Sequence, residues 1–179
     1  MEKHKQLYVL VLVLVLSFRT QAQSTIEKIG DYGLYSMPII ALSSTIIEKD
    51  LKGTFMFGKG FVLNTVLTLG LKEVVKKERP NDEDLNSFPS GHTSVTFQSA
   101  AFMQKRYGWK YGIPAYTIAA YTGFSRVYAD KHFVEDVAVG AVIGIISSYI
   151  FTKKRSLNTT SFSFDKQGKD FYLSYSYQF

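Results

Sequence analysis

The chain contains no cysteine among its 179 residues. Disulfide bonds and thiolate metal sites are therefore excluded, so the folded protein is held together by packing alone. Histidine is scarce, with three residues in the whole chain, so the place of each one is informative. No aspartate-rich metal cage is visible in the sequence, and neither a metal nor another cofactor is expected.

Basic residues outnumber acidic ones, at 21 Lys and Arg against 15 Asp and Glu, which gives a formal net charge of +6. A modest positive balance fits an anionic ligand or an anionic lipid surface. Nucleic acid is not expected as a partner, because no basic run is interleaved with aromatic residues along a groove-sized segment.

Residues 1–22 have the pattern of a secretory signal peptide. A basic start precedes an apolar run from Leu7 to Leu16, and Ala22 offers a small residue for cleavage, with Thr20 at the −3 position. The run is shorter than the roughly 20 apolar residues of a membrane span. We therefore expect an exported protein, with an uncleaved N-terminal anchor as the alternative because Arg19 lies close to the cut.

The remaining residues suit one domain, and their pattern predicts an all-α fold, a bundle of about five to six helices. Pro80 should end the second helix near Arg79, because proline disfavours the helical conformation of the residue before it. Gly108 should stop the third helix, and Asp130 is the expected N-cap of the fifth. The expected helices cover residues 33–47, 58–78, 91–107, 114–128 and 130–152.

In the tail, residues 157–179, the spacing of apolar residues changes from a helical period to alternation with polar residues. Phe162 and Phe164 alternate with serines, residues 165–170 read as a turn, and apolar residues again alternate with polar ones from Phe171 onward. This alternation predicts a short C-terminal β-hairpin. Because a lone hairpin is only marginally stable, it should pack on the helices, on a partner or on a membrane interface.

Lys72 and Arg79 are the first candidate pair of binding residues. On one helix, seven residues place them about 20° apart around the axis and roughly 10.5 Å apart along it. Two cations on one stripe can reach the same anion from two directions. The alternative is a solvated basic face, because Lys76 and Lys77 lie nearby.

Ser90, Gly91 and His92 lie at a predicted junction between a loop and a helix. The first turn of a helix has unpaired N–H groups and a partial positive charge, so a phosphate oxygen binds there readily. Gly91 lets the backbone come close to the anion, and His92 can hand a proton to a departing alkoxide. An ordinary serine N-cap beside a surface histidine is the alternative.

Arg126, His132 and Asp136 form a third group within eleven residues. Arginine offers a planar fork that can bind two phosphate oxygens at once. His132 and Asp136 share a face if the helix starts before His132, and a carboxylate on one ring nitrogen leaves the other free to attack phosphorus. A surface His–Asp pair is the alternative.

One shared function explains the three groups of residues better than three unrelated explanations do. The cations Lys72, Arg79 and Arg126 can neutralise the equatorial oxygens of a phosphoryl group while two histidines flank the phosphorus. Phosphoryl transfer needs little beyond in-line positioning and charge stabilisation. Three fixed cations can therefore take the place of Mg²⁺.

In order, these residues read Lys-x6-Arg-Pro, Pro-Ser-Gly-His and Ser-Arg-x5-His-x3-Asp. This series resembles the type 2 phosphatidic acid phosphatase superfamily, to which bacterial class A acid phosphatases and vanadium haloperoxidases also belong. The resemblance spans Lys72 to Asp136. It implies that residues 23–156 form a phosphatase domain with the helical core of that family.

The resemblance also implies a metal-independent phosphatase that hydrolyses a phosphomonoester or a diphosphate through a phosphohistidine. By this likeness His132 is the nucleophile, Asp136 is its orienting partner, and His92 is the acid that protonates the leaving group. The phosphate would be bound by the other motif residues, which are Lys72, Arg79, Ser90, Gly91 and Arg126.

The apolar helices and the aromatic content favour a lipid phosphate or diphosphate as substrate, at the periplasmic side of a bacterial membrane, with the protein embedded or peripheral. A soluble periplasmic acid phosphatase of broad specificity is the alternative, because the apolar segments are near the lower length limit for a span. A vanadate-dependent haloperoxidase would use nearly the same residues, but such enzymes are much larger chains. A non-catalytic anion-binding membrane module would require the loss of a reacting group, and none is missing.

Overall fold

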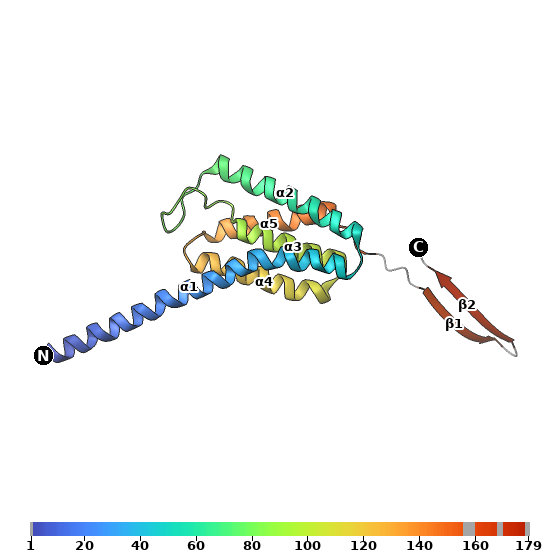
Figure 1. Ribbon diagram of the computed structural model, residues 1–179, viewed down its shortest axis with the longest axis horizontal. Helices are drawn as coiled ribbons and strands as arrows, with labels where there is room; N and C mark the ends of the chain where they lie inside the picture. The colour runs from blue at the N-terminus through green and yellow to red at the C-terminus, as the bar shows by residue number, and fades with distance from the viewer. Residues whose placement is uncertain (1, 156–159, 168–169, 178–179) are drawn as a thin grey trace.

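The computed structural model describes residues 2–155, 160–167 and 170–177, and the side chains of residues 25–155, 163–166 and 171–176. Five helices are followed by a two-stranded hairpin, which confirms the expected fold class (Figure 1). The elements are α1 (Glu2–Ile47), α2 (Leu51–Val75), α3 (Gly91–Tyr107), α4 (Trp109–Tyr128), α5 (Val134–Phe151), β1 (Thr160–Gln167) and β2 (Asp170–Tyr177).

Helix α3 is the centre of the bundle and contacts all four other helices. Residues 76–90 and 129–133 connect helices at one end, which we call the site end, and the α1–α2 turn lies at the opposite end (Figure 1). Phe57 of α2 packs edge-on against Phe102 of α3, with ring centroids 5.1 Å apart. This aromatic pair forms the apolar core together with alanines of α1, α3 and α4 and with the methionines Met37 and Met103.

Helix α2 differs from the expectation at both ends. It begins at Leu51 and not at Gly58, because the side chain of Asp50 caps it by accepting a hydrogen bond from the Gly53 N–H at 2.9 Å. It ends at Val75, since Lys76 adopts a left-handed conformation with φ 45°. The expected continuation to Arg79 is therefore wrong.

The other helices agree with the expectation to different degrees. Helix α3 has the expected bounds, with the Ser90 side chain as its N-cap and Gly108 after its last turn. The fifth helix starts at Val134, and the expected start at Asp130 is wrong because that residue has φ 54°. Helices α1 and α4 begin earlier than expected, while cleavage after Ala22 stays a prediction.

Helices α3 and α5 approach each other unusually closely through two glycines of α5. A Cβ atom on Gly144 would lie 2.3 Å from the backbone oxygen of Ser94, and one on Gly140 would lie 2.6 Å from the backbone oxygen of Ser90. Small residues spaced four apart allow helix backbones to pack in this way. The contact joins the start of α5 to the start of α3, where the Ser90 N–H donates to the Asp136 carbonyl at 3.0 Å.

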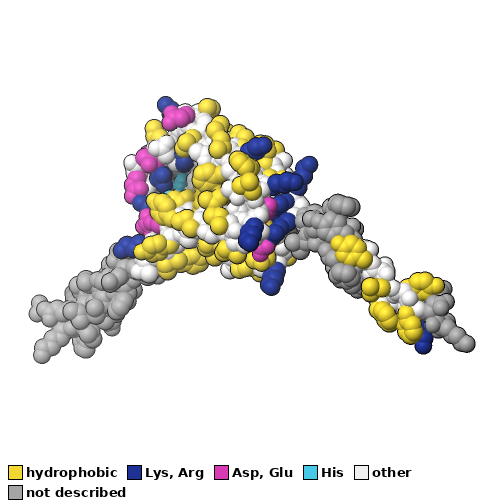
Figure 2. Space-filling model, turned by 45° about the vertical axis from the view of Figure 1, so that its right-hand side comes forward, with side chains coloured by type: hydrophobic (Ala, Val, Ile, Leu, Met, Phe, Trp, Pro, Cys, Tyr) yellow, Lys and Arg dark blue, Asp and Glu magenta, His cyan; other side chains and the backbone are white. Residues whose placement is uncertain are grey.

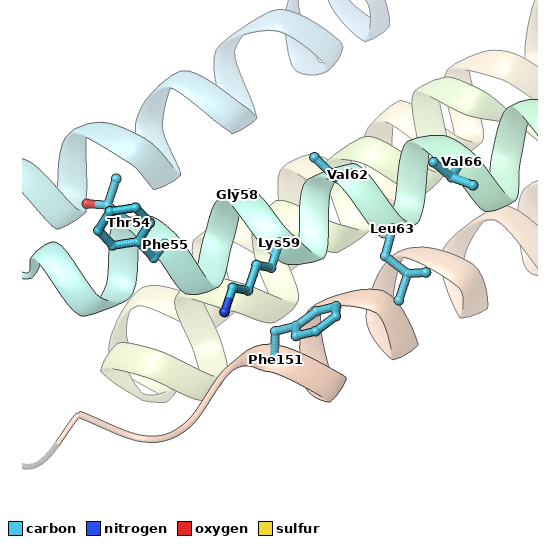
Figure 3. A pocket seen from close by; sticks show the side chains of 8 residues that line it. All are labelled: Thr54, Phe55, Gly58, Lys59, Val62, Leu63, Val66 and Phe151. Atoms are coloured by element: carbon cyan, nitrogen blue, oxygen red, sulfur yellow. The ribbon is translucent and has the colours of Figure 1, made fainter.

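Much of the outer surface of the bundle is apolar. Helices α2 and α5 are long and apolar enough to cross a membrane, and only 22% and 33% of their most apolar windows are buried in the protein. A groove of about 550 Å³ runs between them (Figure 3). Its lining is apolar apart from Thr54 and Lys59, and includes Phe55, Val62, Val66 and Phe151.

Charge is distributed unevenly between the two ends of the bundle, as Figure 2 shows. Helix termini and turns at the end opposite the site carry nine Lys or Arg residues, namely Lys49, Lys52, Lys59, Lys105, Arg106, Lys110, Lys153, Lys154 and Arg155. Acidic residues within the same segments are Glu48 and Asp50, and each is paired with one of these arginines. The opposite end is therefore strongly basic, whereas acidic side chains collect at the site end.

The hairpin has an apolar and a polar face. Strands β1 and β2 are antiparallel, with Phe164 opposite Leu173 and Asp165 opposite Tyr172. Phe164 and Phe171 stack at 5.5 Å between ring centroids, and both remain largely exposed. Among the described residues no contact joins the hairpin to a helix, so the expected packing of the hairpin on the helices is not observed.

We expect Gly144→Ala to lower the stability of the bundle by roughly 1–3 kcal/mol, because the new methyl group would overlap the α3 backbone. The midpoint of thermal unfolding in detergent measures this change. Gly70→Ala in α2 is the matched control, since a Cβ there meets nothing within 4 Å. Equal midpoints for both variants would contradict the close packing.

Candidate active site

The eight predicted site positions, which lie in or beside the loops at residues 76–90 and 129–133, converge at the site end. Ser90, Gly91 and His92 begin α3, with the Ser90 hydroxyl accepting from the Thr93 N–H at 3.5 Å. A cavity of about 240 Å³ lies beside them. It is lined by Leu34, Asn64, Thr65, Thr68, Leu69, Lys72, Gly91, His92, Ser94 and Val95.

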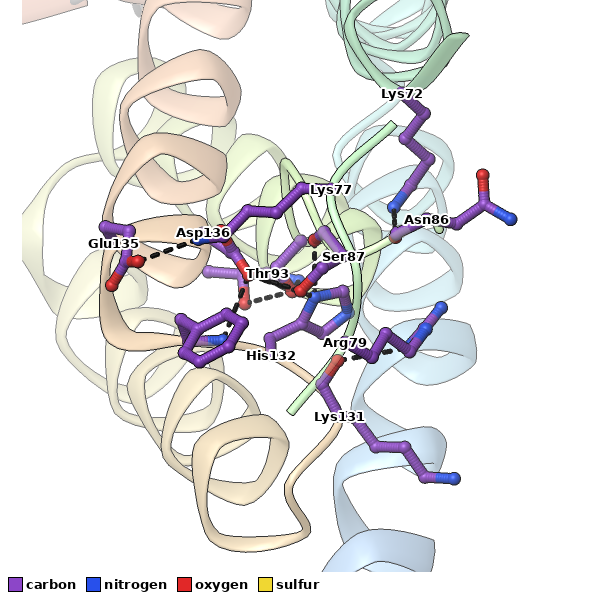
Figure 4. Close-up of polar contacts among 12 residues, drawn as sticks. Lys72, Lys77, Arg79, Asn86, Ser87, Thr93, Lys131, His132, Glu135 and Asp136 are labelled. Carbon is purple, nitrogen blue, oxygen red and sulfur yellow. Dashed lines mark hydrogen bonds and ion pairs between the residues drawn. The ribbon is translucent and has the colours of Figure 1, made fainter. Parts of the chain in front are cut away.

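Lys72 and Arg79 reach the site from different elements, so the single helical stripe expected for them is wrong. Lys72 lies in the last turn of α2, and its ammonium group donates to the carbonyl of Asn86 (Figure 4). Arg79 lies in the loop after α2, where it donates to Asp84 at 2.7 Å and to the Lys131 carbonyl at 3.2 Å. The loop thereby brings Arg79 next to the segment that carries His132.

Arg126 is buried near the end of α4, with 3% of its surface exposed. Its guanidinium donates to the Asp31 carboxylate at 2.8 Å and to the backbone carbonyl of Glu27. Both acceptors belong to α1. The same Asp31 oxygen is 2.9 Å from Nε2 of His92, so α1 forms one wall of the site.

His132 lies in the loop before α5 and is nearly buried. Its Nδ1 is 2.6 Å from the carbonyl oxygen of Ser87, and a carbonyl can only accept, so Nδ1 carries the proton. The neutral ring then keeps a lone pair on Nε2, for which the described residues offer no hydrogen-bond partner. This is the tautomer that a nucleophilic histidine needs.

Asp136 does not contact His132 in the expected way. Its nearest carboxylate oxygen is 3.9 Å from Nδ1, because α5 begins after His132 and the two residues do not share a helical face. The Asp136 carboxylate instead accepts from the Phe133 N–H at 3.0 Å, from the Ser87 hydroxyl and from Lys77 at 2.8 Å (Figure 4). It therefore anchors the segments on either side of His132.

Positive charge at the site acts directly on the histidines. Burial, followed by the charges of Arg79 and Lys72, lowers the pKa of His132 to about 3. Burial, Arg126 and Arg79 also lower the pKa of His92, and Asp31 opposes this shift. The three cations and two imidazoles that the sequence indicated therefore lie within electrostatic reach of one another.

Three residues of the site were not predicted. Lys77 was grouped with the solvated basic face, but it pairs with Asp136 and Glu135 and lies over the Phe133 ring at 4.3 Å. The three sequence motifs include neither Ser87 nor Asp31. No local pattern marks Asp31, which is 61 residues away from its partner His92.

The fold and the site define a helical-bundle hydrolase of phosphate esters. A family model described as the PAP2 superfamily matches residues 72–159. This match bears out the resemblance to that superfamily which the three motifs indicated.

Several relatives are similar over most of the chain. The lipid A 4'-phosphatase of Helicobacter pylori strain J99 is 29% identical, covering 99% of this chain and 100% of its own. The lipid A 1-phosphatase of the same strain is 26% identical, with 71% of each chain covered. The crystal structure of Aquifex aeolicus LpxE is similar with a TM-score of 0.63 and 27% identity, covering 73% of this chain and 84% of that one.

We expect the His132 ring to stay neutral down to about pH 4, since burial and two cations hold its pKa near 3. Protonation then begins well below the ordinary histidine range around 6.5. Nitrogen chemical shifts of labelled histidine in detergent, assigned with the His132→Asn variant, measure this titration. A midpoint near 6.5 would contradict the arrangement of charges described above.

Proposed function

We propose that the chain is a metal-independent phosphatase that transfers a phosphoryl group from a lipid phosphate or diphosphate to His132 and then to water. The observation that carries this proposal is the Ser87 carbonyl on Nδ1 of His132. It fixes the ring with the Nε2 lone pair available, while burial and the charges of Arg79 and Lys72 keep the ring unprotonated. A neutral imidazole beside two cations suits attack on an anionic phosphorus centre.

The proposed binding residues would neutralise the negative charge of the phosphoryl group, each at a different oxygen. Lys72, Arg79 and Arg126 would each contact its oxygens, and the N-terminus of α3 at Ser90 and Gly91 would add backbone N–H donors. Such preorganised donors stabilise the transition state most where charge spreads over the equatorial oxygens. Asp136 supports this set by holding Ser87 and Lys77 in place.

The reaction would proceed in two balanced steps. First, the His132 Nε2 lone pair forms a bond to phosphorus as the bond to the leaving oxygen breaks, and protonated His92 gives that oxygen its proton. Second, neutral His92 takes a proton from water as the hydroxide forms a bond to phosphorus and the phosphorus–nitrogen bond breaks. The products are the dephosphorylated lipid and inorganic phosphate, and both histidines regain their starting states.

A lipid substrate is supported by the surroundings of the site. The cavity beside Lys72 and His92 has an apolar wall formed by Leu34, Leu69 and Val95. Similar proteins are named as lipid A phosphatases. Together these observations favour a lipid over the soluble phosphomonoester considered above.

We also propose that the bundle is embedded in a membrane with the site at the periplasmic face. The apolar windows of α2 and α5 are mostly unburied, which suits contact with acyl chains better than contact with water. Basic residues concentrate at cytoplasmic ends of membrane helices. The basic end of this bundle lies opposite the site (Figure 2), so the positive-inside tendency supports a periplasmic site.

We expect His132→Ala to reduce phosphate release by at least about a thousandfold, because the variant loses the atom that would form the covalent bond. Release of inorganic phosphate from phosphatidic acid and from lipid A in detergent micelles measures this loss. Lys110→Ala at the opposite end of the bundle is a control that should keep full activity. Undiminished turnover in the histidine variant would contradict the mechanism.

The absence of cysteine allows the orientation to be tested with single introduced thiols. We expect Asp82→Cys at the site end to react with a membrane-impermeant maleimide in cells whose outer membrane alone is permeabilised. Lys154→Cys should react only after the inner membrane is also opened. The reverse labelling pattern would place the site at the cytoplasmic face.

A further inference from the structure

One carboxylate oxygen of Asp31 is shared between two residues of the site. Its Oδ1 is 2.9 Å from Nε2 of His92 and 2.8 Å from Nη1 of Arg126. The side chain is 42% exposed, so Asp31 is not a buried core residue. None of the three sequence motifs includes this residue.

The fold holds Asp31 in place from two sides. A Cβ atom on Gly30 would lie 1.9 Å from Oγ of Ser125, and one on Gly33 would lie 2.2 Å from Oγ1 of Thr122, so α1 lies against α4 where it lacks side chains. Arg126 additionally donates to the Glu27 carbonyl, one turn earlier on α1. Asp31 is therefore placed by helix packing as well as by its own hydrogen bonds.

The geometry decides which nitrogen of His92 carries the proton that faces α1. An ionised carboxylate can only accept, so Nε2 donates to Asp31 and the remaining nitrogen, Nδ1, is left for the substrate. Charges around the ring come from Asp31 of α1, Arg126 of α4 and Arg79 of the loop after α2. Burial, together with the charges of Arg126 and Arg79, lowers the pKa of His92, and Asp31 is the anion in this set that opposes the shift.

We infer that Asp31 is the positioning carboxylate of His92, which orients the ring through Nε2 and stabilises its protonated form so that Nδ1 can protonate the leaving oxygen. This inference rests on the proposed phosphatase function. In the first step the Nδ1 proton passes to the oxygen that leaves phosphorus, and the bonding pair of the broken bond stays on that oxygen. The ring becomes neutral and keeps its Nε2–H on Asp31.

This assignment separates the roles of the two carboxylates at the site. Asp136 accepts from Phe133, Ser87 and Lys77 and stays 3.9 Å from its histidine. Asp31 is bonded directly to its histidine. The carboxylate–imidazole pair expected at His132 is thus found at His92, on an aspartate from the other end of the sequence.

The test uses the dependence of each variant on the leaving group. Protonation by His92 matters for an alkoxide, as in phosphatidic acid, and little for p-nitrophenolate, which leaves without a proton. We expect Asp31→Asn to lower kcat/KM, which reports the step in which the leaving group departs and not the later attack by water, at least about tenfold for phosphatidic acid and less than about threefold for p-nitrophenyl phosphate. His92→Gln should show the same selectivity, and the double variant should be no worse than His92→Gln alone.

Asp82→Asn removes another carboxylate from the site end and is the matched control, with wild-type rates expected on both substrates. An equal loss on both substrates in Asp31→Asn, or additive losses in the double variant, would overturn the inference. A lower KM with unchanged kcat would also overturn it, since Asp31 would then merely occupy the phosphate position. If the wild-type protein releases no phosphate from either substrate, the proposed function itself fails.

Discussion

The site depends on the close approach of α5 to α3 at Gly140 and Gly144. These glycines let the start of α5 lie against the start of α3, so that Ser90 can donate to the Asp136 backbone. The segment carrying His132 is held between these two helix starts and the loop at Ser87. Bulkier residues would separate the N-terminus of α3, which we propose binds the phosphate, from His132, the proposed nucleophile.

The site is organised before any substrate arrives. Each cation has an internal acceptor: Lys72 the Asn86 carbonyl, Arg79 the Asp84 carboxylate and Arg126 the Asp31 carboxylate. These bonds hold the charged groups in fixed directions and limit the reorganisation needed when a phosphate enters. The same bonds keep positive charges apart that would otherwise repel one another around two imidazoles.

The sequence predicted the architecture and the members of the site better than their contacts. Ser90 and Gly108 are strong local signals for the ends of α3, and alternation predicted the hairpin, so both were found. The prediction that Lys72 and Arg79 share one helical face was wrong, because α2 ends where Lys76 adopts a left-handed conformation. A lysine at this position gives no sequence signal for that conformation. Asp31 could not be predicted from the sequence, because its contacts with His92 and Arg126 arise only when α1 packs on the other helices.

The rotation of α1 about its own axis determines whether its hydrogen-bond acceptors reach the site. Glu27 and Asp31 lie one turn apart on the same side of that helix, and Arg126 binds both. Rolling α1 by a single residue, about 100°, would carry both acceptors away from Arg126 and His92 together. The contacts of His92 and Arg126 therefore depend on the rotation of α1, whereas the contact between His132 and the Ser87 carbonyl, which other elements form, does not.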